Sequence, residues 1–313
     1  MKHSSRKTTK LTANFTEDVV GFALESFLTQ IGFPFLRFSI EPFSRSKERW
    51  LGADARLHSN LRGFRPFYMQ FKRPEGYPDH SRSKVITDRK SLGLQISPIT
   101  LSFPLRGKQP HHFDFQHNIL LRLRNRLQSK GIGDAAYICP KFLDRSSYRL
   151  SLHWAGLLRW RPWAKQPWDI EELLVDVGGS QIRFGRMPVL AEHVSIPPHA
   201  AVNSANHRYS FTEAGTELCF HSPLSLPEQQ QSLADFMKSI FGGFLDGGQK
   251  ILVEDANREL AELVEEVFSE STKIDPGFAF SLDDDPFGNW NDWGDFLARE
   301  FEIEQYAFML WDR

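Results

Sequence analysis

The sequence predicts a mixed α/β (α+β) fold, because strand-like and helical hydrophobic spacing alternate in its first half and helical spacing returns near its end. The 313 residues are 41% hydrophobic and 25% charged, which is typical of a globular protein and argues against a disordered or fibrous chain. Within residues 15–150 the expected order is helix, three strands, helix and strand. No apolar run approaches the ~18 residues that a membrane-spanning helix requires.

The chain is expected to open with a helix and an aromatic strand. Residues 15–30 show apolar side chains at helical spacing, with Thr16 as a suitable N-cap and Gly32 as a suitable end. Residues 33–40 follow as a strand rich in aromatic side chains. Residues 1–14 precede them as a flexible basic tail that lacks the apolar segment of a secretory signal.

The next elements complete a predicted core over residues 15–150. Strands are expected at 50–58 and 66–72, and the two could pair as a hairpin. The basic segment 75–110 is rich in Pro and Ser and long for a loop, so we expect it to be partly ordered or functional. An amphipathic, Arg-rich helix is expected at 115–127 and a further strand at 134–139.

Two more regions follow this core. Residues 151–225 form a mixed extension rich in Trp and in strand-like pieces, and residues 226–313 form an acidic helical region. The Trp-rich stretch 154–168 is more typical of a core or an interface than of a base-stacking surface.

The near-neutral net charge of −1 hides an asymmetry. Residues 1–170 contain 29 basic and 13 acidic residues, a balance of +16, and the remainder carries −17. A basic half suits a polyanion such as nucleic acid, because neutralised phosphates release counterions. Alternatively, the two halves attract each other within one body. The acidic region could repel DNA, imitate it, or bind a basic protein partner and thereby restrain the other half.

The cysteines and histidines show no pattern of a disulfide framework or of a metal-binding motif. Cys139 and Cys219 cannot form a disulfide framework and have no zinc-motif spacing, which predicts a reduced cytoplasmic compartment. The histidines, including the pair His111 and His112, also lack a metal-binding spacing, and we expect structural or surface roles for them. His117 is kept as a candidate contact to nucleic acid.

One constellation points to phosphodiester chemistry. Side chains alternate along a strand, so Gln70 and Lys72 are expected on one face, and a hairpin would bring Asp54 beside Gln70. Asp54, the Gln70 amide and the Phe71 backbone carbonyl offer the oxygen ligands that Mg²⁺ prefers, and Glu17 can add a second carboxylate. Lys72 can orient the attacking water or offset charge in the transition state.

These residues, in the order α-β-β-β-α-β, resemble the PD-(D/E)xK nuclease superfamily, with the restriction-endonuclease-like core. The match is closest to the variant in which Gln replaces the second acid, as in Mrr-like enzymes, and the phrase GADA…YMQFKRP is similar to proteins of bacterial restriction and anti-phage defence loci. The resemblance covers about residues 15–142. It implies a Mg²⁺- or Mn²⁺-dependent nuclease with metal ligands Asp54 and Gln70, catalytic Lys72 and helix acid Glu17.

Some assignments stay open at this level. Glu25 competes with Glu17, because a spacing of eight residues places both on one helix face. The resemblance suggests Gln116 near the metal or the DNA. Further candidate nucleic-acid contacts are His117, Arg122, Arg126 and Arg73.

The expected activity is hydrolysis of nucleic acid, DNA in preference to RNA. A dimer or other homo-oligomer would suit cleavage of both strands. The rival expectation is a nuclease-fold scaffold, catalytically weak because Gln70 is neutral, that binds nucleic acid or a partner subunit.

Overall fold

The protein is described here by a computed structural model that covers residues 10–31, 38–42, 61–159, 174–177, 180–183, 189–221, 227–228, 231–245, 252–268 and 286–311. Among these residues the helices are α1 (Glu17–Ile31), α4 (Lys84–Ser91), α5 (Gln116–Ser129), α6 (Ser146–Arg159), α7 (Leu233–Leu245), α8 (Val253–Phe268) and α9 (Pro286–Phe301). The strands form two six-stranded sheets and the small pair β7 (Leu174–Val177) and β8 (Ser180–Arg183). None of the described helices is long and apolar enough to cross a lipid bilayer.

The central sheet is mixed and has the order β13-β9-β6-β3-β14-β2. Its strands are β2 (Phe38–Pro42), β3 (Leu61–Phe71), β6 (Asp134–Pro140), β9 (His193–Ile196), β13 (Gln231–Ser232) and β14 (Glu304–Trp311). β3 and β6 run parallel, and β14 is antiparallel to both of its neighbours. The approach of β6 to β3 is close, since a Cβ added at Gly133 would lie 2.1 Å from the carbonyl oxygen of Pro66.

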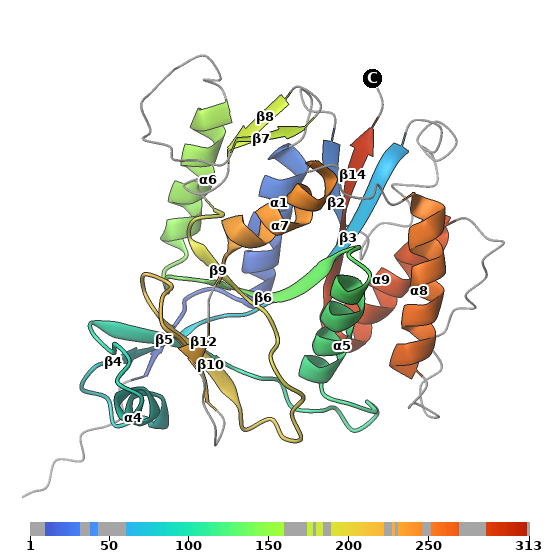
Figure 1. Ribbon diagram of the computed structural model, residues 1–313. Coiled ribbons are helices and arrows are strands. Elements are labelled where there is room, and N and C mark those ends of the chain that lie inside the picture. The colour runs from blue at the N-terminus through green and yellow to red at the C-terminus, as the bar shows by residue number, and fades with distance from the viewer. Residues whose placement is uncertain are drawn as a thin grey trace, which may run out of the picture.

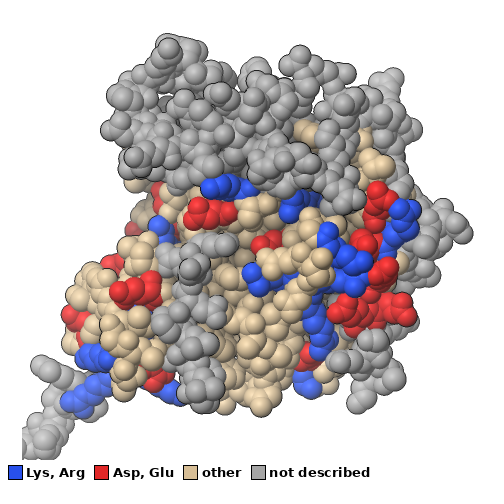
Figure 2. Space-filling view, in the orientation of Figure 1, with Lys and Arg blue, Asp and Glu red and all other residues tan. Residues whose placement is uncertain are grey.

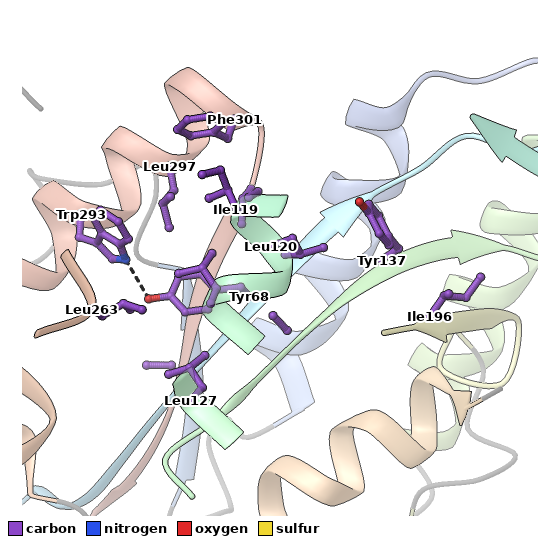
Figure 3. Close-up of a cluster of buried hydrophobic side chains, with 14 of the residues drawn as sticks. Tyr68, Ile119, Leu120, Leu127, Tyr137, Ile196, Leu263, Trp293, Leu297 and Phe301 are labelled. Atoms are coloured by element: carbon purple, nitrogen blue, oxygen red, sulfur yellow. Dashed lines mark hydrogen bonds between the residues drawn. The ribbon is translucent and has the colours of Figure 1, made fainter. Parts of the chain in front are cut away.

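Helices cover both faces of this sheet, with α1 and α7 on one side and α5, α8 and α9 on the other (Figure 1). Side chains of β3 alternate between the two layers. Phe67, Met69 and Phe71 pack toward α1 and α7. Tyr68 packs toward the other helices and accepts a hydrogen bond from Nε1 of Trp293 at 3.0 Å (Figure 3). Burial of the strand on both faces explains why Phe67, Tyr68 and Met69 are consecutive large apolar residues.

The lateral sheet, with the order β1-β4-β5-β10-β11-β12, is antiparallel. Its strands are β1 (Leu11–Thr12), β4 (Glu75–Pro78), β5 (Ile99–Pro104), β10 (Arg208–Thr212), β11 (Leu218–Phe220) and β12 (Pro227–Glu228). β4, α4 and β5 all lie within the predicted long segment 75–110, so that segment is mostly ordered. Ser83 caps α4 by accepting a hydrogen bond from the backbone N–H of Ile86 at 3.3 Å.

The mixed α/β class and several elements agree with the sequence-based predictions. The helix expected at 15–30 is α1, the helix expected at 115–127 is α5, and the strand expected at 134–139 is β6. The boundary of β3 differs, since it begins at Leu61 rather than at 66. The strand expected at 33–40 overlaps β2 (Phe38–Pro42), and residues 33–37 lie outside the described residues.

The possible hairpin between residues 50–58 and 66–72 stays a prediction, because residues 50–58 lie outside the described residues. Over residues 67–69, however, both edges of β3 are occupied, by β6 on one side and by β14 on the other. One of the two neighbours of β3, strand β14, therefore comes from the C-terminal end of the chain. Sequence reasoning placed the helical region 226–313 apart from the sheet and did not identify β14 as a strand.

Elements from all three predicted regions share the central sheet, because β9 comes from residues 151–225 and both β13 and β14 come from residues 226–313. The basic and acidic halves also meet. Arg126 on α5 forms ion pairs with Glu259, Glu262 and Glu266 of α8, and Lys130 pairs with the first two of these. Blue and red side chains accordingly lie side by side on the face that carries α5 and α8 (Figure 2). Part of the charge asymmetry is therefore neutralised within the fold.

Candidate functional site

The end of β3 carries two buried polar side chains toward α5. Gln70 is 1% exposed and Lys72 is 4% exposed. Lys72 directly follows β3, and its backbone N–H donates to the carbonyl of Ile138 at 2.9 Å, which prolongs the pairing with β6. The alternation expected from the sequence, with Gln70 and Lys72 on one face and Met69 and Phe71 on the other, agrees with the packing of their neighbours.

Lys72 lies in a low-polarity environment. Its Nζ is 3.4 Å from Oε1 of Gln116, the first residue of α5, and 5.9 Å from the centre of the Tyr137 ring. Burial lowers the pKa of Lys72, and the carboxylates of Glu17 and Glu302 oppose this shift without cancelling it. An ammonium with a lowered pKa exchanges a proton more readily near neutral pH than an exposed lysine does.

Gln70 is the least satisfied polar group at this site. Its Oε1 and Nε2 are both buried, and neither has a hydrogen-bond partner among the described residues. Leaving a buried amide unpaired costs roughly 1–3 kcal/mol per group, so such a group calls for an explanation such as a ligand, an ion or water. Gln116, in contrast, is fixed at both ends, because its Nε2 donates to the backbone carbonyl of Phe301.

Glu17 begins α1 at the rim of a cleft of ≈ 820 Å³. Its Oε1 accepts a hydrogen bond from the backbone N–H of Arg73 at 3.2 Å, which ties α1 to the end of β3. The residues that line the cleft come from α1, the end of β3, α9 and β14: Thr16, Glu17, Asp18, Gly21, Phe71, Arg73, Asp295, Ala298, Arg299, Glu302 and Glu304. Glu25 is not among them, so the geometry favours Glu17 over Glu25 as the helix acid.

The two other predicted metal ligands are Asp54 and Phe71, and the structure describes only the second. Asp54 lies outside the described residues, so its distance from Gln70 stays a prediction. Phe71 lines the cleft, and its ring packs against α1 at Gly21, where an added Cβ would lie 3.0 Å from the ring. Glycine at this helix position therefore allows the close contact.

The predicted nucleic-acid contacts are mostly engaged within the protein. Arg126 is occupied by α8, as described above, and Arg122 pairs with Asp114. Gln116 is buried, and its side chain is hydrogen-bonded to Lys72 and to the carbonyl of Phe301. It can therefore influence the site by holding Lys72. Arg73 is exposed at the rim of the cleft and remains positioned for a phosphate contact.

His117 is a core residue, which corrects its prediction as a contact to nucleic acid. It is 1% exposed, Nδ1 accepts from the hydroxyl of Tyr137 at 2.8 Å, and Nε2 donates to the carbonyl of Ala200 at 3.0 Å. His193 is similarly enclosed between Tyr148 and the carbonyl of Val189. Burial lowers the pKa of both His117 and His193 to about 4.

We therefore expect the protein to lose stability in mild acid. The unfolded chain binds protons at each histidine near its ordinary pKa of about 6.5, whereas the folded chain does so only near 4, so the free energy of unfolding falls as the pH drops through this window. The loss is on the order of 3 kcal/mol per histidine. Urea titrations between pH 7.5 and 4.5 measure it. His117→Gln should flatten the pH dependence and exposed His153→Gln should not; equal slopes in both variants would contradict this account.

The acidic lining contributed by α9 and β14 was missed by sequence reasoning. Asp295, Glu302 and Glu304 lie more than 220 residues after Lys72 in the chain, and no motif links them to it. Glu302 lies in the turn between α9 and β14 and forms an ion pair with Arg106 at 2.6 Å. Only the insertion of β14 beside β3 brings these carboxylates to the cleft.

Ser210, His221 and Asp88 are arranged like a serine nucleophile with its base and orienting acid, but the serine is inaccessible to substrate. Oγ of Ser210 is 2.7 Å from Nε2 of His221, and Nδ1 of His221 is 3.0 Å from Oδ2 of Asp88. Ser210 is fully buried on β10, which pairs on both edges, and Arg89 donates to its Oγ at 3.1 Å. The neighbouring pocket is lined by His221 and Asp88 but not by Ser210. The network therefore joins α4 to the lateral sheet rather than presenting a reactive hydroxyl.

The residues brought together at the end of β3 are thus Gln70, Lys72 and Gln116, with Glu17 at the adjoining cleft. No known family, no curated protein and no solved structure matches the chain.

Proposed function

We propose that the protein is a metal-dependent nuclease whose site lies at the end of β3. The observation that carries the proposal is the pair formed by Gln70, with both amide atoms buried and unpartnered, and Lys72, buried with a lowered pKa. An unpaired amide beside a buried ammonium is costly for stability alone, which favours a functional reason for both.

The residues present fit a hard divalent cation. The unpartnered Oε1 of Gln70 and the carboxylate of Glu17 are oxygen donors of the kind that Mg²⁺ or Mn²⁺ prefers, and Asp54 is proposed as the third. Gln70 and Lys72 do not line the adjoining cleft, but its five carboxylates against two arginines favour a cation beside Glu17. When bound, the metal would lower the pKa of a coordinated water and offset phosphate charge.

The side chains of this chain then divide the remaining work. Lys72, held by Gln116, would stabilise negative charge developing on the phosphate or exchange a proton with the attacking water. Arg73 at the rim would contact a neighbouring phosphate. Because the cleft is rich in carboxylates, we expect binding of the nucleic acid to depend on the cation.

The finer fold assignment is part of this proposal. Helix α1, the strand β3 that carries Gln70 and Lys72, and the parallel strand β6 reached through α5 support a restriction-endonuclease-like core, in which β14 would be an addition. From the resemblance of the motif, we propose DNA as the favoured substrate and bacterial restriction or anti-phage defence as the setting.

The competing proposal is a nuclease-fold scaffold that binds a partner. Its support is the neutralisation of α5 by α8, which removes Arg126 and Lys130 from the charge available to a nucleic acid. A phosphate-binding face on α5 is therefore smaller than the charge of the first half suggests.

Cleavage assays with the full chain separate the two proposals. Plasmid DNA, single-stranded DNA and RNA are incubated with the protein and Mg²⁺ or Mn²⁺, with EDTA as the metal-free arm and Asp54→Ala as the site variant. We expect metal-dependent cleavage of DNA that is lost in the variant. Absence of cleavage of all three substrates by the wild-type protein would contradict the nuclease and favour the scaffold; cleavage retained by Asp54→Ala would exclude the proposed ligand set.

A further inference from the structure

A cluster of metal-ligand side chains lies outside the site at the end of β3. His111 and His112 precede α5, Glu300 lies in the last turn of α9, and one ligand atom from each lies within 4.8 Å of the other two. Nε2 of His111 is 3.4 Å from Oε2 of Glu300, and Nε2 of His112 is 3.8 Å from the same oxygen. Two imidazole nitrogens and one carboxylate oxygen are a donor set suited to Zn²⁺.

The burial of His112 is an independent observation in favour of a ligand. Its side chain is 4% exposed, and its ring lies 4.6 Å from that of Phe301, centre to centre. Its Nε2 is buried and has no hydrogen-bond partner among the described residues. Oε2 of Glu300 lies 3.8 Å away, beyond hydrogen-bond distance, so the ring nitrogen loses its hydration without a full replacement. Coordination to a metal would supply one.

The other groups around the cluster are compatible with a cation. Oε1 of Glu300 accepts a hydrogen bond from Nε of Arg299 at 2.9 Å, so Oε2 faces the histidines. A hydrogen bond that orients a carboxylate ligand in this way is common at metal sites. The nearby cation Arg106 is paired with Glu302 at 2.6 Å, which reduces its repulsion of a metal ion.

We propose that His111, His112 and Glu300 form a zinc site with three protein ligands and a remaining position for water. The site joins the end of α9 to the turn before α5. Phe301 follows Glu300 directly, and its carbonyl accepts from Gln116, the residue that contacts Lys72. Bound zinc would thus strengthen a contact between two segments almost 190 residues apart in the chain, independently of any nuclease activity.

Zinc titration of the full chain without an affinity tag tests the proposal. We expect calorimetry to show one equivalent of Zn²⁺ bound, and Co²⁺ in its place to give the visible absorption of a low-symmetry nitrogen–oxygen site. His111→Ala, at an exposed residue, and Glu300→Gln should each weaken binding by about tenfold or more. His112→Ala should do the same if it folds, which circular dichroism checks.

Two controls make the result specific. His153→Ala, at an exposed histidine on α6, should bind zinc like the wild type. So should Asp54→Ala, which removes a proposed metal ligand of the nuclease site and thereby separates the two sites. Absence of saturable binding by the wild type would overturn the proposal. Unchanged affinity in both His111→Ala and Glu300→Gln would also overturn it, since the metal would then bind elsewhere.

Discussion

The Lys72→Met variant is expected to lose at least about 100-fold in metal-dependent cleavage while remaining folded. A hundredfold loss corresponds to about 2.7 kcal/mol of transition-state stabilisation. Met keeps the length and apolar stem of the buried side chain but removes the ammonium that contacts Gln116. Removing a buried charge also removes its desolvation cost, so we expect the Tm to stay within a few degrees of the wild-type value.

The comparison needs a partly buried lysine whose side-chain contact lies outside the site. Lys141 meets this need, because burial also lowers its pKa while its Nζ contacts the carbonyl of Ala214. Initial rates of plasmid cleavage at saturating Mg²⁺ should therefore fall in Lys72→Met and not in Lys141→Met. Wild-type rates in the Lys72 variant would remove this residue from the mechanism, and a loss of nucleic-acid binding equal to the loss of rate would make it a phosphate contact instead.

A chain that ends at Phe301 is expected not to fold. The missing segment contains β14, which pairs with β3 on one side and with β2 on the other. Its loss would remove the buried side chains Tyr306, Phe308 and Met309 and leave β3 without a partner along most of one edge. Each large buried side chain contributes about 1.5–3 kcal/mol, so the total is comparable to the whole stability of a domain.

Circular dichroism and urea denaturation measure the outcome. The control chain ends at Trp311, keeps all of β14, and should unfold cooperatively like the wild type. A soluble, cooperatively folded chain ending at Phe301 would show that β14 is dispensable. Restraint by the acidic region is best tested by charge reversal at Glu259 and Glu262. Truncation at residue 225 is unsuitable, because it removes β12, β13, β14 and three helices.

Local sequence patterns predicted those elements whose periodicity is complete within themselves. Helices α1 and α5 show apolar stripes at helical spacing, and β6 is a short apolar run after a glycine turn. The lateral sheet was harder to predict, because β4 and β5 are short and lie in a segment rich in Pro and Ser. Strand β14 was missed since its sequence, EQYAFMLW, follows an acidic helix and resembles a continuation of that helical region.

For the candidate site, too, local patterns predicted the placement of some residues and failed for those whose partners are distant in the chain. Alternation along a strand placed Gln70 and Lys72 on one face, and helix-start chemistry identified Glu17, which lies at the cleft. His117 and Arg126 were predicted to contact nucleic acid, but both are occupied within the protein. The sequence shows that these side chains are polar, but it does not show which groups they bind in the fold. Tyr137 and the carbonyl of Ala200 take up His117, and α8 takes up Arg126.

The sequence by itself determined the mixed α/β class, the helical and strand segments with self-contained periodicity, and the alternation that exposes one face of β3 to α5. Tertiary structure decided which strand lies beside β3, which carboxylates line the cleft, and which basic residues are neutralised. The physical reason is that sheet pairing and ion pairing act between residues far apart in the chain. Their partners are selected by the packing of the whole core, and no local spacing records that choice.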